Sequence, residues 1–63
     1  MKKVKFKDLK VGDKFFCWGD QLINYDSPVW CECIKESDWT SLEVDPGGVR
    51  FGISPNTEIS IEV

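Results

Sequence analysis

The sequence predicts an all-β domain, and two observations carry this prediction. Short segments of alternating apolar and polar residues recur about every ten residues, separated by turns rich in Gly, Pro, Asp and Ser. No window of eleven residues without Gly or Pro holds the helical period of 3.6. With 63 residues, the chain has room for a single domain, which we expect to span residues 1–63.

The N-terminal elements are two strands and the turn between them. Residues 3–7 alternate strictly, so Val4 and Phe6 share one face while the lysines take the other. A turn at residues 8–13 leads into a second strand at residues 14–18. This first part of the chain contains apolar residues that the later strands must cover: Phe6, Leu9, Val11 and Phe15.

The middle of the chain is expected to supply two further strands. Residues 19–28 form either a short hairpin or a long loop, because Asp26-Ser27-Pro28 breaks the pattern. Residues 29–36 are the longest strand candidate, with Val29, Cys31 and Cys33 pointing inward. Residues 39–44 follow a polar turn and form an alternating strand. Its more apolar face is expected to point into the core, which would bury Thr40, Leu42 and Val44.

The C-terminal part begins with the strongest local signal, the turn Asp45-Pro46-Gly47-Gly48. Proline presets its own φ and glycine accepts the positive φ that follows, so a hairpin is expected here. Beyond it, one face is predicted to be buried: Val49, Phe51 and Ile53. A turn with 3₁₀ character is expected at residues 54–57, followed by a strand that alternates to the end of the chain.

Five or six antiparallel strands of this length are most economically arranged as a small SH3-like barrel. Closure of the barrel brings the last strand beside the first. The lysines of residues 3–7 then lie near the carboxylates of residues 58–62. Such pairing would account for much of the uneven charge, since residues 1–14 have a balance of +4 and the remainder −7.

Composition limits the possible functions. The net charge of −3 argues against general duplex binding, and no apolar run approaches the roughly 20 residues that span a bilayer. Met1-Lys2-Lys3 is not followed by the apolar segment of an export signal, so we expect a cytoplasmic protein.

The chemistry-bearing residues favour a protein that is not an enzyme. Histidine, the commonest general base, is missing from the sequence. Cys17, Cys31 and Cys33 are expected to be buried free thiols, because Cys31 and Cys33 are too close in sequence to pair without strain. A zinc site on these three thiols would lack both a fourth ligand and the usual C-x₂₋₄-C spacing, so we expect no metal and no cofactor.

The outward faces of the strands are unusually aromatic. If Phe15 and Cys17 point inward, Phe16 and Trp18 must point outward. The same alternation turns several more large apolar side chains to the outside: Trp30, Ile34 and Trp39. A contiguous exposed patch of this kind normally marks an interface.

We therefore predict a binding surface at Phe16, Trp18, Trp30, Ile34 and Trp39, with Glu32 beside them. Its expected acidic rim is Glu32, Glu36, Asp38 and Glu43. The alternative is that bulges or the 19–28 segment cover the aromatics in a second small core, with Tyr25 and Pro28 as lids. A nucleic-acid-binding alternative is centred on the N-terminal lysines: Lys3, Lys5, Lys7, Lys10 and Lys14. A purely structural or assembly role is the third possibility.

Three segments carry a resemblance to a known group of proteins. They are Phe6-Lys-Asp-Leu-Lys-Val-Gly-Asp-Lys-Phe15, the strand Cys33-Ile34-Lys35, and Phe51-Gly-Ile-Ser-Pro-Asn-Thr-Glu-Ile59. Together they resemble small phage- and prophage-encoded proteins that are mostly of unknown function. The resemblance implies an SH3-like barrel and transfers no catalytic or binding residue. The long 19–28 segment and the aromatic and cysteine content around Trp18 and Trp30 depart from that pattern.

These observations lead to one functional expectation. We expect a non-enzymatic module of a mobile element that binds a protein partner, or itself, through its outward aromatics. A host defence or nucleic-acid-handling enzyme is the partner that this association suggests, and nucleic acid itself is the less expected partner.

Overall fold

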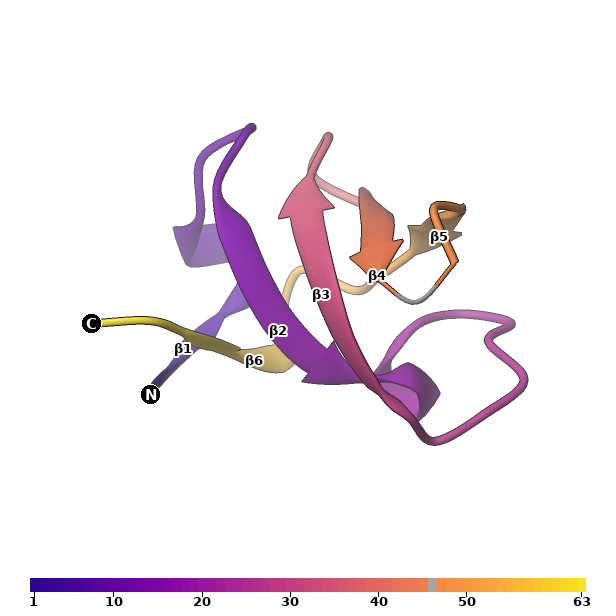
Figure 1. Ribbon diagram of the computed structural model, residues 1–63. Coiled ribbons are helices and arrows are strands. Elements are labelled where there is room, and N and C mark those ends of the chain that lie inside the picture. Colours follow the sequence, from indigo (N-terminus) through magenta and orange to yellow (C-terminus); the bar gives the residue numbers. More distant parts are fainter. Residues whose placement is uncertain (46) are drawn as a thin grey trace.

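A computed structural model describes residues 1–45 and 47–63 and shows an all-β protein (Figure 1). Over these residues, the chain forms six strands and two short 3₁₀ helices. In chain order they are β1 (Lys2–Lys5), η1 (Phe6–Asp8), β2 (Lys14–Trp18), η2 (Gly19–Gln21), β3 (Trp30–Lys35), β4 (Thr40–Asp45), β5 (Arg50–Gly52) and β6 (Glu58–Ile61). None of the helical segments in the described residues has the length and apolarity needed to cross a membrane.

The six strands form one antiparallel sheet in the order β1-β6-β2-β3-β4-β5. The last strand lies beside the first, as predicted, and its other edge pairs with β2; both chain ends lie on the same side of the molecule (Figure 1). Strands β2 and β3 form the longest continuous ladder, from Lys14 opposite Ile34 to Trp18 opposite Trp30. This topology is consistent with the SH3-like arrangement.

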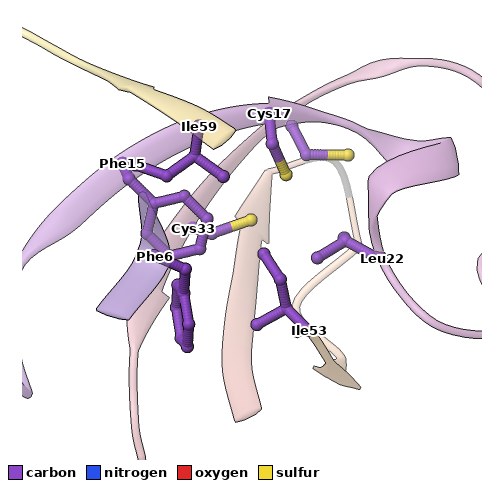
Figure 2. Close-up of a cluster of buried hydrophobic side chains, with 8 residues drawn as sticks. Phe6, Phe15, Cys17, Leu22, Cys33, Ile53 and Ile59 are labelled. Carbon is purple, nitrogen blue, oxygen red and sulfur yellow. The ribbon is translucent and has the colours of Figure 1, made fainter. Parts of the chain in front are cut away.

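The core lies on the inner face of the sheet and is small. Phe6 and Phe15 meet edge to face, with ring centroids 5.4 Å apart. Figure 2 shows the thiols of Cys17 and Cys33 in the same cluster as the aliphatic side chains. The buried apolar residues are Phe6, Phe15, Cys17, Leu22, Cys31, Cys33, Ile53 and Ile59.

Strand β4 turns the opposite face inward from the one predicted. Ser41 and Glu43 are buried, whereas Val44 is exposed and Thr40 and Leu42 are only half-buried. A β-bulge causes part of this difference: Glu32 pairs with Asp45 but Cys33 pairs with Glu43, which leaves Val44 as an extra residue. A shift of one residue exchanges the two faces of a strand. The prediction that the more apolar face of β4 is buried was therefore wrong.

Three valines that were predicted to be buried, Val29 and Val49 by alternation and Val11 as an apolar turn residue, are also on the surface. Val11, Val29 and Val49 have exposed fractions of 68%, 40% and 51%. Each lies in a turn or just outside a strand, where the period of two does not decide the direction of the side chain. A barrel of this size simply has no interior space for every apolar residue.

The connections differ from the predictions in detail. Residues 54–57 form a single turn, closed by the Thr57 amide donating to the Ser54 carbonyl at 3.0 Å, while the 3₁₀ helices lie at the end of β1 and of β2. The 19–28 segment is mostly loop and contributes one isolated bridge, Ile23 with Gly52. Strands β4 and β5 form the expected hairpin, with Gly48 at a φ of +70°; the predicted role of Pro46 lies outside the described residues.

Lys35 is the one basic side chain buried within the described residues. Its ammonium donates hydrogen bonds to the carbonyl oxygens of Phe6 at 3.1 Å and Leu9 at 2.8 Å. The same nitrogen lies 4.6 Å from the centroid of the Phe6 ring, in a cation–π contact. Lys35 therefore fastens η1 and the residues after it to the inner face of β3.

We expect Lys35→Met to destabilise the fold by about 2 to 4 kcal/mol, because two buried carbonyls lose a charged donor. Chemical denaturation followed by tryptophan fluorescence measures the change. Lys7→Met, on an exposed position of the adjacent η1, is the matched control and should change stability by no more than about 0.5 kcal/mol. Equal stability of the two variants would show that the buried ammonium contributes nothing.

Candidate functional site

Three aromatic side chains meet on the outer face of β2 and β3. The rings of Phe16 and Trp30 are nearly parallel, at 3°, with centroids 6.2 Å apart. The rings of Trp18 and Trp30 meet at 66°, with centroids 4.9 Å apart. We call Phe16, Trp18 and Trp30 the aromatic patch.

The patch follows from strand alternation and antiparallel register. On β2, Phe15 and Cys17 fill the core, so their neighbours Phe16 and Trp18 point to the other face. On β3, Cys31 is buried and Trp30 is therefore outward, directly opposite Trp18. Trp18 and Trp30 keep exposed fractions of 50% and 41%, whereas Phe16 is half-buried beneath them. The contacts thus order the rings without removing them from solvent.

Apolar and charged side chains continue the same face toward the other end of β3. Ile34 lies opposite Leu42 of β4, and both are half-buried. Lys14 lies opposite Ile34, with its ammonium 5.6 Å from the centroid of the Phe16 ring. Glu32 is directly opposite Phe16, so a carboxylate borders the centre of the patch. Leu42 was not predicted for this face because the assignment of β4 was inverted.

Trp39, also predicted for the site, lies elsewhere. It precedes β4 in the turn beyond the far end of β3, and β3 alone runs five residue steps from Trp30 to Lys35, or about 17 Å. Its exposed fraction is 59%, and within the described residues its ring makes no aromatic contact. The structure therefore brings Phe16, Trp18 and Trp30 together and leaves Trp39 apart from them.

The predicted acidic rim is only partly present. Glu43 is buried in the interior, so its assignment to the rim was wrong; the inverted face of β4 is the reason. Glu36 accepts a hydrogen bond at 2.7 Å from the guanidinium of Arg50, which offsets its charge. Glu32 and the exposed Asp38 remain as outward carboxylates of the predicted rim.

The 19–28 segment does not cover the aromatic patch. In Figure 1 it extends from the end of β2 to the right of the strands, and Trp18 and Trp30 keep about half of their surface exposed. Tyr25, the expected lid, packs instead on Phe51, with ring centroids 4.8 Å apart, and Pro28 is exposed. Gly19 makes this packing possible, since a Cβ there would lie 2.6 Å from the Tyr25 ring.

The N-terminal lysines are spread over several elements, and β6 neutralises some of them. Lys3 lies 3.9 Å from a carboxylate oxygen of Glu58, and Lys5 is opposite Glu58 in the ladder. Lys14 pairs with Glu62 at 3.0 Å, and this hydrogen bond and charge raise the pKa of Lys14. Lys7 and Lys10 lie on η1 and the following turn, and both are exposed. The predicted charge pairing between the first and last strands is thus present for Lys3 and Glu58, whereas Glu62 pairs with Lys14 of β2.

The three thiols belong to the core. Cys17 and Cys31 are cross-strand partners, and all three cysteines are free and buried. Burial raises the pKa of Cys31, and a hydrogen bond with Cys17 together with burial raises the pKa of Cys33. A high pKa keeps a thiol protonated and therefore a weak nucleophile and metal ligand. Among the described residues, no three Cys, Asp or Glu side chains are grouped so that they could hold a metal ion.

The sequence did not predict a surface hollow that lies beside the 19–28 segment. Its lining includes Tyr25, Glu43 and Phe51. The signal that was available is the parity of β3: if Cys31 and Cys33 point inward, so does Lys35. Cys33 lies directly opposite Glu43 and Lys35 opposite Ser41, so the inward face of β3 also turns these two polar residues inward.

Comparisons with protein-family models, curated proteins and solved structures gave no match to this chain. The function must therefore be argued from the geometry of the chain itself.

The raised thiol pKa values predict how stability depends on pH. Near pH 7, thiols are protonated in both states; above their ordinary pKa of about 8.5, only the unfolded chain releases these protons. Stability should therefore fall as the pH rises from about 8 to about 10. The raised pKa of Tyr25, caused mainly by its hydrogen bond to Glu43, acts in the same direction.

Urea unfolding at several pH values under reducing conditions tests this expectation. The midpoint should decrease with pH, and Cys33→Ala should show a shallower decrease than the wild type. A midpoint that stays constant or rises over this range would contradict the assignment.

Proposed function

We propose that this protein is a non-enzymatic binding module that engages a protein partner, or a second copy of itself, through the aromatic patch. The observation that carries the proposal is the contiguous contact of Phe16, Trp18 and Trp30 on one exposed sheet face. Leaving two large apolar side chains half-exposed to water is unfavourable in a domain with so small a core. Binding a partner would bury this surface.

The rigidity of the patch supports the same proposal. Trp30 is held between Phe16 and Trp18, and all three project from the longest ladder of the sheet. Preordered aromatic side chains lose little conformational entropy on binding, and tryptophan is the residue most enriched at interface hot spots. The neighbouring Ile34 and Leu42 extend the apolar contact area along β3 and β4.

Charge indicates the kind of partner. Glu32 borders the centre of the patch, and residues 15–63 carry an excess of acidic side chains. A complementary surface would be apolar at its centre with a basic group opposite Glu32, which favours encounter with basic partners. We attribute the module to a mobile genetic element of phage type, on the resemblance of residues 6–15, 33–35 and 51–59, and we place its action in the cytoplasm.

The competing functions receive less support. The carboxylates of Glu58 and Glu62 lie beside Lys3 and Lys14, which reduces the positive potential that phosphate binding requires. The absence of histidine from the sequence and the high pKa of the buried thiols argue against general-base or thiolate catalysis.

Replacing both exposed tryptophans of the patch should abolish association without unfolding the protein. We expect Trp18→Ser/Trp30→Ser to weaken partner capture, or self-association, by at least about 100-fold, as hot-spot residues do. Light scattering after gel filtration measures self-association, and affinity capture from host lysate followed by titration of the purified partner measures heterologous binding. Circular dichroism checks that the fold persists.

Trp39→Ser is the matched control, since Trp39 is the same residue type, is also exposed and lies outside the patch. It should change binding by less than about threefold, as expected for a residue outside the hot spot. Equal losses in the two variants would contradict the proposed patch. The proposal would also fail if the wild-type protein is monomeric and the double substitution leaves its binding to a captured partner unchanged.

A further inference from the structure

The hollow beside the 19–28 segment has a volume of about 290 Å³ and shares no residue with the aromatic patch. Two of its walls are aromatic: the rings of Tyr25 and Phe51 meet at 53°, with centroids 4.8 Å apart. Rings at such an angle form a corner that presents aromatic surface to a small ligand. The remaining wall includes Val49, and Asp26 lies at the rim.

Glu43 is the most deeply buried polar residue that lines this hollow; the exposed Asn24, Asp26 and Ser27 supply the rest of its polar lining. The side chain of Glu43 is on the inward face of β4 and has an exposed fraction of only 1%. The neighbouring turn passes close over the carboxylate, because a Cβ on Gly47 would collide with Oε1 of Glu43. Glu43 is therefore held in place by the strand and by the β4–β5 turn, and it does not swing freely into solvent.

The immediate partners of this buried carboxylate are neutral. Oε2 of Glu43 lies 3.6 Å from the Cys31 thiol, which is also 3.4 Å from the Val29 carbonyl oxygen, and Tyr25 is the other neutral group whose pKa is raised by hydrogen bonding to Glu43. Hydrogen bonding to Glu43 and burial both hold Tyr25 in its protonated, uncharged form by raising its pKa. Among the residues described, none of the lysines or Arg50 forms an ion pair with Glu43.

A buried charge without a counter-charge is costly, and proteins normally compensate it. Lys35 is the buried basic side chain, but its ammonium donates hydrogen bonds to the carbonyl oxygens of Phe6 and Leu9. It also lies four residue steps along β3 from Cys31, or about 13 Å. Asp26 at the rim adds negative charge to the hollow and no positive charge. Among the described residues, no basic side chain therefore supplies a counter-charge to Glu43.

We propose that the hollow is a binding site for an organic ammonium group, which would be seated in the Tyr25–Phe51 corner against Glu43. Aromatic faces attract cations electrostatically, and the carboxylate supplies the counter-charge. The volume suits a head group of a few carbon atoms and is below the range of most drug-sized ligands. The proposal does not rest on the function proposed for the aromatic patch.

An ammonium group can reach the site from two sources, a free small amine or a lysine side chain of a peptide. NMR titration of the intact ¹⁵N-labelled protein at low ionic strength separates them. One arm uses choline chloride, and the second uses N-acetyl-lysine-N′-methylamide. The third uses 3,3-dimethylbutan-1-ol, which has the shape of choline without its charge.

Choline or the lysine derivative should shift the amide signals of Tyr25, Glu43, Val49 and Phe51 with saturation in the millimolar range. The neutral alcohol should bind at least about tenfold more weakly, because it lacks the charge that both the rings and the carboxylate attract. Tighter binding of choline identifies a free quaternary amine as the class of ligand, and tighter binding of the lysine derivative identifies a peptide side chain.

Two substitutions test the residues. Glu43→Gln keeps the shape and the acceptor oxygen, and should weaken the binding of the cations at least about tenfold without weakening that of the alcohol. Phe51→Leu removes one aromatic face while keeping apolar volume, and should weaken the cations by about five- to tenfold. Glu58→Gln, which removes the same charge from an exposed position on β6, is the matched control and should leave the affinity unchanged.

The proposal is overturned if the alcohol binds as tightly as choline, because the site would then be merely apolar. It is also overturned if the shifted signals lie outside the hollow, or if neither cation causes saturable shifts. Should Glu43→Gln fail to fold, the comparison of the three ligands on the wild type and on Phe51→Leu still decides the matter.

Discussion

The ammonium group of Lys35 holds the N-terminal third of the chain against the rest of the barrel. It donates hydrogen bonds to the Leu9 carbonyl, just beyond the short helix η1, and to the Phe6 carbonyl, which also accepts from the Leu9 amide at 3.1 Å. The backbone of Lys35 binds the following turn as well: its carbonyl accepts from Gly12 at 2.8 Å and its amide donates to Asp13 at 3.0 Å. One residue thus fixes η1 and the 9–13 turn on β3, and Phe6 is seated in the core as a result.

This fastening decides which residues remain for the outer face. With Phe6 and Phe15 packed edge to face, the inner side of β2 is occupied by Phe15 and Cys17. Alternation then leaves no interior position for Phe16 or Trp18, and the register of β2 with β3 sets Trp30 beside both. The aromatic patch is therefore a consequence of how the small core is filled. A sequence that needed only a stable barrel would place polar residues at these three positions.

Much of this could be read from the sequence because β2 and β3 obey a simple rule. Phe15, Cys17, Cys31 and Cys33 are the inward residues that alternation predicts, and the ring contacts of the patch follow from them.

Alternation predicted the wrong inward face for β4, because Leu42 and Val44 are its apolar residues. Burial of polar residues cannot be foreseen from hydrophobicity, since it depends on partners from distant segments: Lys35 on Phe6 and Leu9, and Glu43 on Tyr25 and Cys31. The bulge at Val44 is equally a property of pairing and not of the β4 sequence itself. Trp39 was assigned outward from that wrong face; its exposure comes from its position in a turn.

The two buried charges of the interior are treated very differently by the fold. Lys35 is surrounded by carbonyl oxygens and an aromatic face, all of which stabilise a cation, so its charge is compensated within the chain. Glu43 meets a thiol and a phenol, which are neutral and weak donors, and the pKa of both groups is raised by their surroundings.

If Glu43 served stability alone, a neutral side chain of similar size would do so at lower cost. An uncompensated carboxylate next to two aromatic rings and an open hollow is better explained by a ligand that brings the positive charge. A 63-residue chain with so little core is then left with two surfaces that stability alone does not explain, one apolar on the outside of β2 and β3 and one acidic at the Tyr25–Phe51 corner.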